Sequence, residues 1–104
     1  MTKSKIETYI GFCIRAGKIR FGGAARSLKS AELLILCGTA AKNSQSECAK
    51  LARKFSCPVV KSNKKTVEEL TGKARCKILA ITDKSLARAI LDNLDGDFTE
   101  WEAK

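Results

Sequence analysis

Two short, uninterrupted apolar segments place the strongest limit on what this chain can fold into. Leu33–Cys37 reads Leu-Leu-Ile-Leu-Cys, and residues 77–82 read Lys-Ile-Leu-Ala-Ile-Thr. A strand that alternates apolar and polar residues can leave one face in water, whereas a continuously apolar strand is covered on both faces. The sequence therefore predicts two buried strands of a sheet that has helices packed against it.

Helical patterns alternate with these strands. One apolar stripe begins after a capping box at 4–7 and ends at Gly17, and a second capping box at 44–47 opens a helix that reaches about residue 55. Asp83 is suited to cap a last long helix, because its carboxylate can accept from the free amides of the first turn. The remaining expected elements are strands at 18–21 and 58–60 and short helices at 24–30 and about 67–72.

The order of these elements predicts the fold class. Helices and strands alternate with connections of a few residues, which is typical of an α–β–α sandwich with helices on both faces of a largely parallel sheet. A chain of 104 residues has room for one core. We therefore expect a single α/β domain over residues 1–94, followed by an acidic C-terminal tail over residues 95–104.

The charge of the chain is distributed unevenly. Twenty Lys and Arg against eleven Asp and Glu give +9, but five acids lie in residues 92–104, which leaves 19 bases and six acids, or +13, in residues 1–91. Such a body attracts polyanions, because neutralising phosphates releases condensed counterions. This predicts a nucleic-acid partner, with simple solubility as the alternative. The tail either lies over the basic edge when the nucleic acid is absent or is solvated. In addition, Phe98 and Trp101 are suited to dock back on the body.

The composition argues against several other classes of protein. Five cysteines without a C-x-x-C pair, and no histidine at all, predict reduced and buried thiols, no metal site and no cofactor. The phosphate-binding loops of nucleotide enzymes and the nucleophile elbow of hydrolases are missing, so we expect no enzyme activity. Without a secretory signal or an apolar run near the roughly 20 residues of a membrane helix, we expect a cytoplasmic monomer with no membrane contact.

Three segments are expected to meet where the strands reach their carboxyl ends, which is the working edge of such folds. Residues 18–26 join a basic strand to a Gly-Gly break and a helix start, whose free amides suit a phosphate. Residues 38–42 follow the first buried strand, and residues 72–75 precede the last one. Lys18, Arg20 and Arg26 would add positive charge, and no acid lies between Lys18 and Lys29.

Parts of the chain resemble one known family. Residues 11–18, Gly-Phe-Cys-Ile-Arg-Ala-Gly-Lys, are similar to the opening "LG-x-A-x-RAGK" of bacterial YlxQ-like proteins, a branch of the L-seven-Ae ribosomal protein family, whose archaeal member binds kink-turn RNA. Residues 33–36 with 41–44 resemble that branch's "LV-I-L-A…A-S-E-N-T", and residues 80–87 its "A-V-T-D-K-G-F-A". The resemblance spans about residues 5–92. With the element order, it implies a three-layer α–β–α sandwich around a mixed, mostly parallel four-stranded sheet.

The same resemblance implies where RNA would bind. The family grips sheared G·A pairs with polar residues at the start of its second helix, and a loop before the last strand covers a flipped-out base. By position, the first region would hold Gly22, Gly23 and Arg26, the second Lys73, Ala74 and Arg75, with Thr39, Ala40 and Lys42 flanking both. Gly23, Ala24 and Ala25 stand where the family has Asn or Gln and Glu. This favours phosphate contact over base readout.

The sequence leaves several functions open. Our main expectation is a protein that binds structured RNA, of the kink-turn kind or in the ribosome. A protein-interaction module with the same fold but without the RNA edge is one alternative. A general nucleic-acid binder that acts through charge alone, with a steep salt dependence for every polyanion, is another. A thiol-based redox sensor is a third.

Overall fold

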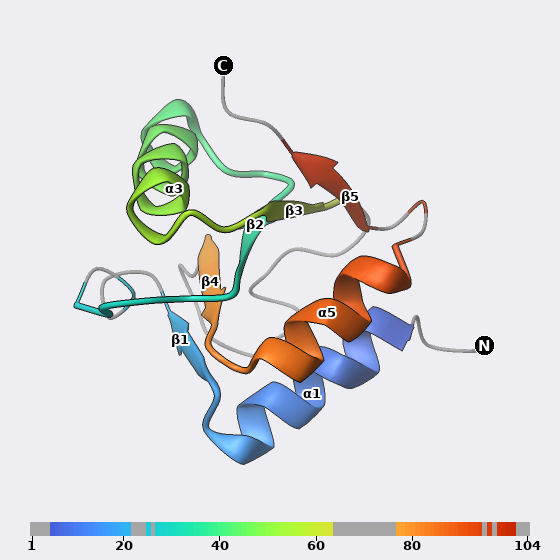
Figure 1. The fold of residues 1–104 in the computed structure, drawn as a ribbon. Helices are drawn as coiled ribbons and strands as arrows, with labels where there is room; N and C mark the ends of the chain where they lie inside the picture. The colour runs from blue at the N-terminus through green and yellow to red at the C-terminus, as the bar shows by residue number, and fades with distance from the viewer. Residues whose placement is uncertain are drawn as a thin grey trace.

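The computed structural model of the chain contains both strands and helices, and it describes residues 5–21, 25, 27–63, 77–94, 96 and 98–101. The helix expected at 24–30 does not include residues 27–30 and is otherwise mostly outside the described residues, as is all of the one expected at 67–72. The elements are α1 (Lys5–Ala16), β1 (Ile19–Phe21), β2 (Leu33–Cys37), α3 (Lys42–Phe55), β3 (Val59–Ser62), β4 (Ile78–Ile81), α5 (Lys84–Asp92) and β5 (Phe98–Trp101) (Figure 1).

The strands form one sheet in the order β1-β4-β2-β3-β5. The sheet is mixed, as expected, but it has five strands rather than four, and it is mostly antiparallel. Among the described strands, β2 and β3 run parallel, while the pairs β1–β4, β2–β4 and β3–β5 are antiparallel. The prediction of a mostly parallel sheet was wrong, because a connection long enough to contain a helix can return the chain to either end of the sheet.

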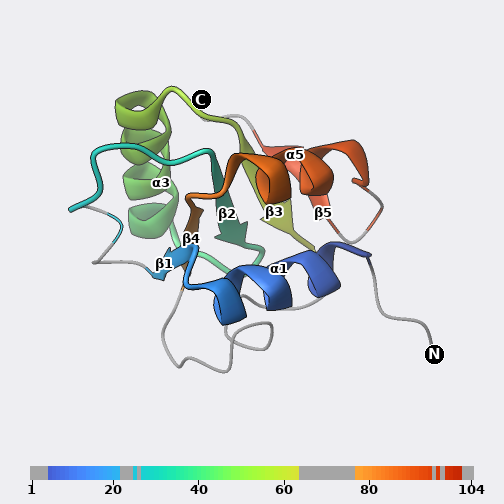
Figure 2. The ribbon, with the colours of Figure 1, turned by 60° about the horizontal axis from the view of Figure 1, so that its bottom comes forward.

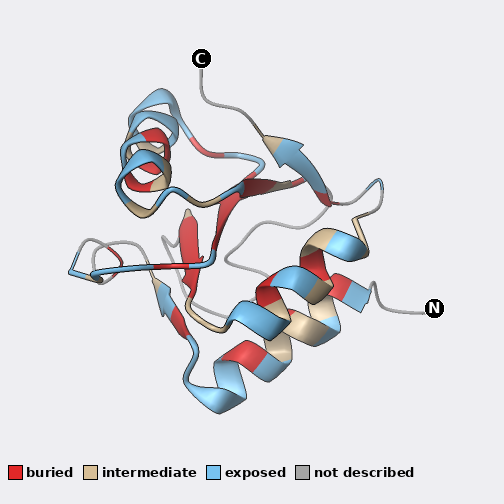
Figure 3. Cartoon of the chain, in the orientation of Figure 1, coloured by how far each residue is buried: buried red, intermediate tan, exposed pale blue. Residues whose placement is uncertain are grey.

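The sheet lies between two helical layers. α3 packs on one face against β2, and α1 and α5 pack together on the other face, where α5 contacts β4 (Figures 1 and 2). All residues of β2 and β4 are buried (Figure 3), which confirms that the two apolar runs are covered on both faces. The α/β sandwich is thereby confirmed. Within the described part of the chain, no helix has the length and apolar character needed to cross a membrane.

Two of the expected helix ends are confirmed and one is displaced. α1 ends at Gly17, whose φ of +69° is left-handed, and the Asp83 carboxylate caps α5 by accepting from the Leu86 amide at 2.9 Å. α3, however, begins at Lys42 after Ala41, three residues before the helix start that a cap at Ser44 predicts. The Gln45 side chain donates to the Ala40 carbonyl at 3.0 Å, so a residue within the helix stabilises its first turn by binding the segment that precedes it.

The acidic end of the chain enters the sheet. Residues 98–101, expected in the tail, form β5 and pair with β3, so that Phe98 lies opposite Ser62 and Trp101 opposite Val59. Phe98 is buried and Trp101 packs partly against the core, which confirms their docking on the body. These four residues are therefore a strand of the sheet, whereas residues 95, 97 and 102–104 of the tail lie outside the described residues. Burial of the aromatic side chains outweighs the neighbouring acids, because Glu100 between them faces solvent.

Candidate nucleic-acid interface

One end of the sheet gathers three segments that are far apart in the sequence. β1 ends at Phe21, which lies opposite Leu79, and β2 ends one residue after Leu36, which lies opposite Ile78. Phe21, the loop after β2 and Lys77, which precedes β4, therefore lie at the same end. We term this end the carboxyl edge and define it as Phe21, residues 38–42 and Lys77. Of the segments that the sequence predicts to share an edge, the sheet pairing brings residue 21 and residues 38–42 to one end, while residues 72–75 lie outside the described residues.

Hydrogen bonds fix the loop that follows β2. The Cys37 amide donates to the Lys77 carbonyl at 2.8 Å, and the Ala40 amide donates to the Cys37 carbonyl at 3.1 Å. The Thr39 hydroxyl lies 3.1 Å from Cys37 Sγ and 3.4 Å from Lys77 Nζ. Because Thr39 is exposed, its hydroxyl and the Lys77 ammonium are presented together at the surface.

Gly38 allows this loop to approach β3 closely. A Cβ at Gly38 would overlap the backbone oxygen of Ser62 and would lie 3.3 Å from its carbonyl carbon. Both obstacles are backbone atoms, which cannot rotate aside as a flexible side chain can. The absence of a side chain at residue 38 therefore sets the position of Thr39, and with it the shape of the carboxyl edge.

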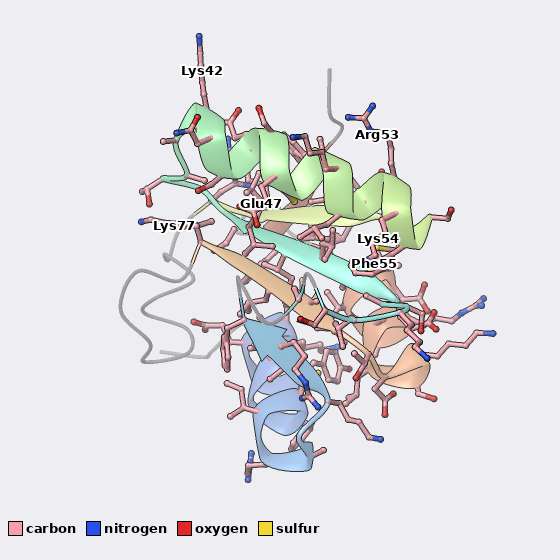
Figure 4. The ribbon with its side chains drawn as sticks, turned by 90° about the vertical axis from the view of Figure 1, so that its left-hand side faces the viewer. Lys42, Glu47, Arg53, Lys54, Phe55 and Lys77 are labelled. Atoms are coloured by element: carbon pink, nitrogen blue, oxygen red, sulfur yellow. The ribbon has the colours of Figure 1, made fainter. Side chains whose placement is uncertain are left out.

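The electrostatics of the carboxyl edge favour an anion. Lys42 is exposed and extends away from the body at the start of α3, while Lys77 lies at the start of β4 (Figure 4). The first-turn amides of a helix have no partner within the helix, and Ala41 supplies no side-chain cap for α3. The positive end of the helix dipole therefore adds to the two ammonium groups, and no residue of the carboxyl edge is acidic.

The structure brings together some of the predicted site residues and separates others. Thr39, Ala40 and Lys42 lie at the carboxyl edge, where Ala40 is buried and its amide and carbonyl are engaged by Cys37 and Gln45. Lys18 lies at the opposite end of the sheet, where its carbonyl accepts from the Thr82 amide at 3.0 Å. The predicted residues that lie outside the described part of the chain are Gly22, Gly23, Arg26, Lys73, Ala74 and Arg75.

Arg20 is also directed away from the carboxyl edge. Its Nη1 donates to the carbonyls of Ile19 at 2.8 Å and of Gly17 at 3.1 Å. β1 is an edge strand, whose outward carbonyls would otherwise be open to another chain. Arg20 covers one of them, so the structure gives this residue a role in closing the sheet edge. Sequence reasoning counted its charge but could not see that the guanidinium folds back on its own strand.

Sequence reasoning missed Lys77 as a site residue, and it placed Gly38 at the working edge only as part of the segment 38–42. Lys77 was counted as the first residue of a buried strand, although it precedes β4 and its ammonium lies beside Thr39. The available signal was its place at the border between a charged stretch and an apolar run. Gly38 gave no signal beyond a turn, because the nearby Ser62 backbone belongs to a strand more than twenty residues later.

The thiols of three cysteines are held in their protonated form. Burial, with a nearby carboxylate in each case, raises the pKa of Cys13 and Cys57 to about 11 and that of Cys48 to about 12. The thiolate is the reactive species, so these thiols are poor nucleophiles at neutral pH. This counts against a redox sensor built on any of these three residues.

The buried thiols predict a loss of stability at alkaline pH. An unfolded thiol ionises near pH 9, whereas the folded thiols do so only at about 11–12. The stabilisation is therefore complete below about pH 9 and is lost as the pH rises through that window, because the unfolded chain releases the protons first. We expect urea unfolding to show a lower free energy at pH 10 than at pH 8. Cys48→Ala should reduce this difference, and an equal difference in both proteins would contradict the assignment.

Comparison with known proteins supports the fold alone. No protein-family model matches the chain, and no curated protein matches it. A solved structure of a protein of unknown function from Bacillus halodurans C superposes with a TM-score of 0.70 and 18% sequence identity, and the match covers 86% of this chain and 96% of that chain. At this identity the likeness concerns the fold. The chain and this structural neighbour thus share an α/β sandwich.

Proposed function

We propose that the chain is an RNA-binding protein of ribosomal-protein type, not an enzyme, and that it holds structured RNA at the carboxyl edge. The observation that carries this proposal is that Lys77 Nζ lies 3.4 Å from the Thr39 hydroxyl at the end of the sheet where α3 begins with the exposed Lys42. Ammonium groups, a hydroxyl and free helix amides are the donors that phosphate oxygens accept from.

The charge of the whole chain supports the same partner. Residues 1–91 carry a net charge of +13, and a field of this size speeds the approach of a polyanion and binds it through counterion release. The donors at the carboxyl edge belong to backbone or to flexible side chains, which contact phosphates without distinguishing bases. We infer that RNA shape and charge contribute more to affinity than base identity does, whether the target is a kink-turn or another structured RNA of the ribosome.

The experiment compares two RNAs and three proteins at two salt concentrations. The RNAs are a kink-turn and the same RNA with its G·A pairs replaced by Watson–Crick pairs. The proteins are the native chain, the variant Lys42→Gln/Lys77→Gln, and the control Lys18→Gln/Lys84→Gln. The control has the same net charge as the first variant but is altered at the opposite end of the sheet. We expect the first variant to bind about tenfold more weakly, with a salt slope shallower by about two, because two phosphate contacts are lost.

The same measurements contain the contradicting outcomes. If Lys18→Gln/Lys84→Gln loses as much affinity as Lys42→Gln/Lys77→Gln, the carboxyl edge is not the binding surface. If the native chain binds neither RNA, the proposed function is wrong. A preference of tenfold or more for the intact kink-turn, about 1.4 kcal/mol, would identify a kink-turn target, whereas equal binding would mean that phosphates and overall shape are read.

A further inference from the structure

The outer surface of α3 carries a row of basic side chains. Lys42, Ser46, Lys50 and Arg53 recur at three- and four-residue spacing, so they lie on one face of the helix. All four are exposed, and the core-facing side of α3 is formed by Cys48, Ala49 and Leu51. We term these four residues the outer stripe. It extends about 16 Å along the helix axis at 1.5 Å per residue.

The outer stripe is positive along its whole length. In Figure 4, Lys42 and Arg53 leave the two ends of α3 on the side away from the sheet, whereas Glu47, the one acid of this helix, lies on the side toward β2. Glu47 is half-buried and is not part of the outer stripe. Lys54, on the flank of α3, adds a further charge and stacks on the Phe55 ring at 5.4 Å.

We propose that the outer stripe of α3 binds the phosphate backbone of a double-stranded RNA stem that continues from the RNA held at the carboxyl edge. This inference rests on the proposed function and extends it. Lys42 belongs to both surfaces, so the carboxyl edge and the outer stripe form one continuous positive path. An RNA strand that contacts Lys77 and Lys42 is thereby directed along α3 toward Lys50 and Arg53.

The side chains of the outer stripe fit a duplex better than a single strand. Proteins that bind single-stranded nucleic acid stack the bases on aromatic side chains, and the outer stripe has none. Two lysines, a serine hydroxyl and an arginine are instead donors for phosphate oxygens. In an A-form stem the bases are stacked inside the helix and phosphates and 2′-hydroxyls lie outside. The outer stripe can therefore hold a stem in place without reading its sequence.

α5, on the other face of the sheet, offers a matched control. Lys84 and Arg88 are exposed there, but Arg88 Nε lies 4.0 Å from the Asp92 carboxylate. Both basic residues also border a shallow hollow with Glu32 and Asp92. Two acids thus lie beside the two bases on this surface, which makes it a poor partner for a continuous row of phosphates.

The experiment measures how binding depends on stem length. The probes are a kink-turn RNA with a long flanking stem and the same RNA with that stem shortened by a helical turn. The proteins are the native chain, Lys50→Glu/Arg53→Glu, the milder Lys50→Gln/Arg53→Gln, and the control Lys84→Glu/Arg88→Glu, which has the same net charge as the first variant. Circular dichroism melts establish that each variant is folded.

We expect the Lys50→Glu/Arg53→Glu variant to bind the long-stem RNA about tenfold more weakly, with a salt slope shallower by about two. The affinity of the native chain should fall by a similar factor when the stem is shortened. The affinity of the Lys50→Glu/Arg53→Glu variant should not fall further on shortening, because its contact with the stem is already lost. The Lys50→Gln/Arg53→Gln variant should lie between the two proteins, and Lys84→Glu/Arg88→Glu should bind both RNAs nearly as the native chain does.

Other outcomes overturn the inference in separable ways. If reversal on α3 weakens both RNAs equally, or if reversal on α5 is as harmful, the outer stripe acts only through bulk charge. If reversal on α3 abolishes binding to anionic lipid vesicles but leaves RNA binding unchanged, the outer stripe faces a membrane surface. Each of these results leaves RNA binding at the carboxyl edge intact. If the native chain binds neither RNA, the proposed function itself fails.

Discussion

Substituting Phe98 with alanine is expected to lower the free energy of unfolding by about 3–5 kcal/mol, the range found when a buried phenylalanine is truncated in a protein core. Phe98 is one of the largest fully buried side chains of the described residues, with 2% of its surface exposed. It is also the first residue of β5, so its loss leaves a cavity and weakens the pairing of β5 with β3. Since natural domains are stable by about 5–15 kcal/mol, a loss of this size is severe.

Chemical denaturation followed by circular dichroism would measure this effect. Glu100→Ala is the matched control, because Glu100 lies in the same strand and is exposed; it should change the free energy of unfolding by less than about 0.5 kcal/mol. Deletion of residues 95–104 should be at least as destabilising as Phe98→Ala. If Phe98→Ala and Glu100→Ala had equally small effects, β5 would contribute little to the fold.

Substituting Gly38 with alanine is expected to cost about 1–3 kcal/mol, as overpacking in a closely packed place does. The added methyl group would overlap the Ser62 backbone oxygen, so the ends of β2 and β3 would have to separate. The displaced loop carries Thr39, whose hydroxyl lies beside Lys77. RNA affinity should therefore fall as well, even at temperatures where the variant is fully folded.

Gly11→Ala provides the comparison for Gly38→Ala. Gly11 lies within α1, and a Cβ there would meet its nearest neighbour, the Arg15 guanidinium, at an ordinary 4.0 Å. Replacing a glycine by alanine inside a helix stabilises by about 0.5–1 kcal/mol. Thermal melts should thus move in opposite directions for the two variants. A rise in melting temperature for Gly38→Ala would show that the loop after β2 relaxes without strain.

The local elements of the fold could be read from the sequence, whereas the pairing of the strands could not. The continuous apolar runs of β2 and β4, the Gly17 end of α1 and the Asp83 cap are set by residues close in the sequence. Strand direction depends on contacts between distant segments, as for Ile19 opposite Ile81. β5 was missed because only Phe98 and Trp101 mark it, within a stretch rich in acids.

The candidate site was predictable in outline but not in its members. The position of residues 38–42 at the end of a buried strand follows from the order of elements, and the carboxyl edge contains them. Lys18 and Arg20 were misplaced because the charge of a residue does not show where its side chain lies. Lys18 precedes β1, whose last residue is the one at the carboxyl edge, and the Arg20 guanidinium folds back on its own strand. Lys77 could be recognised as a site residue only from the structure, which places its ammonium beside the Thr39 hydroxyl.

The strand order also determines when each part of the chain can fold during synthesis. β2, α3 and β3 are consecutive and form the parallel pair, so this unit can assemble as soon as residue 62 has left the ribosome. β1 pairs with β4, which is made roughly sixty residues later, and α1 packs against α5, which follows β4. α1 and β1 are therefore incorporated only after β4 and α5 have been made, and the apolar stripe of α1 stays uncovered by α5 until then.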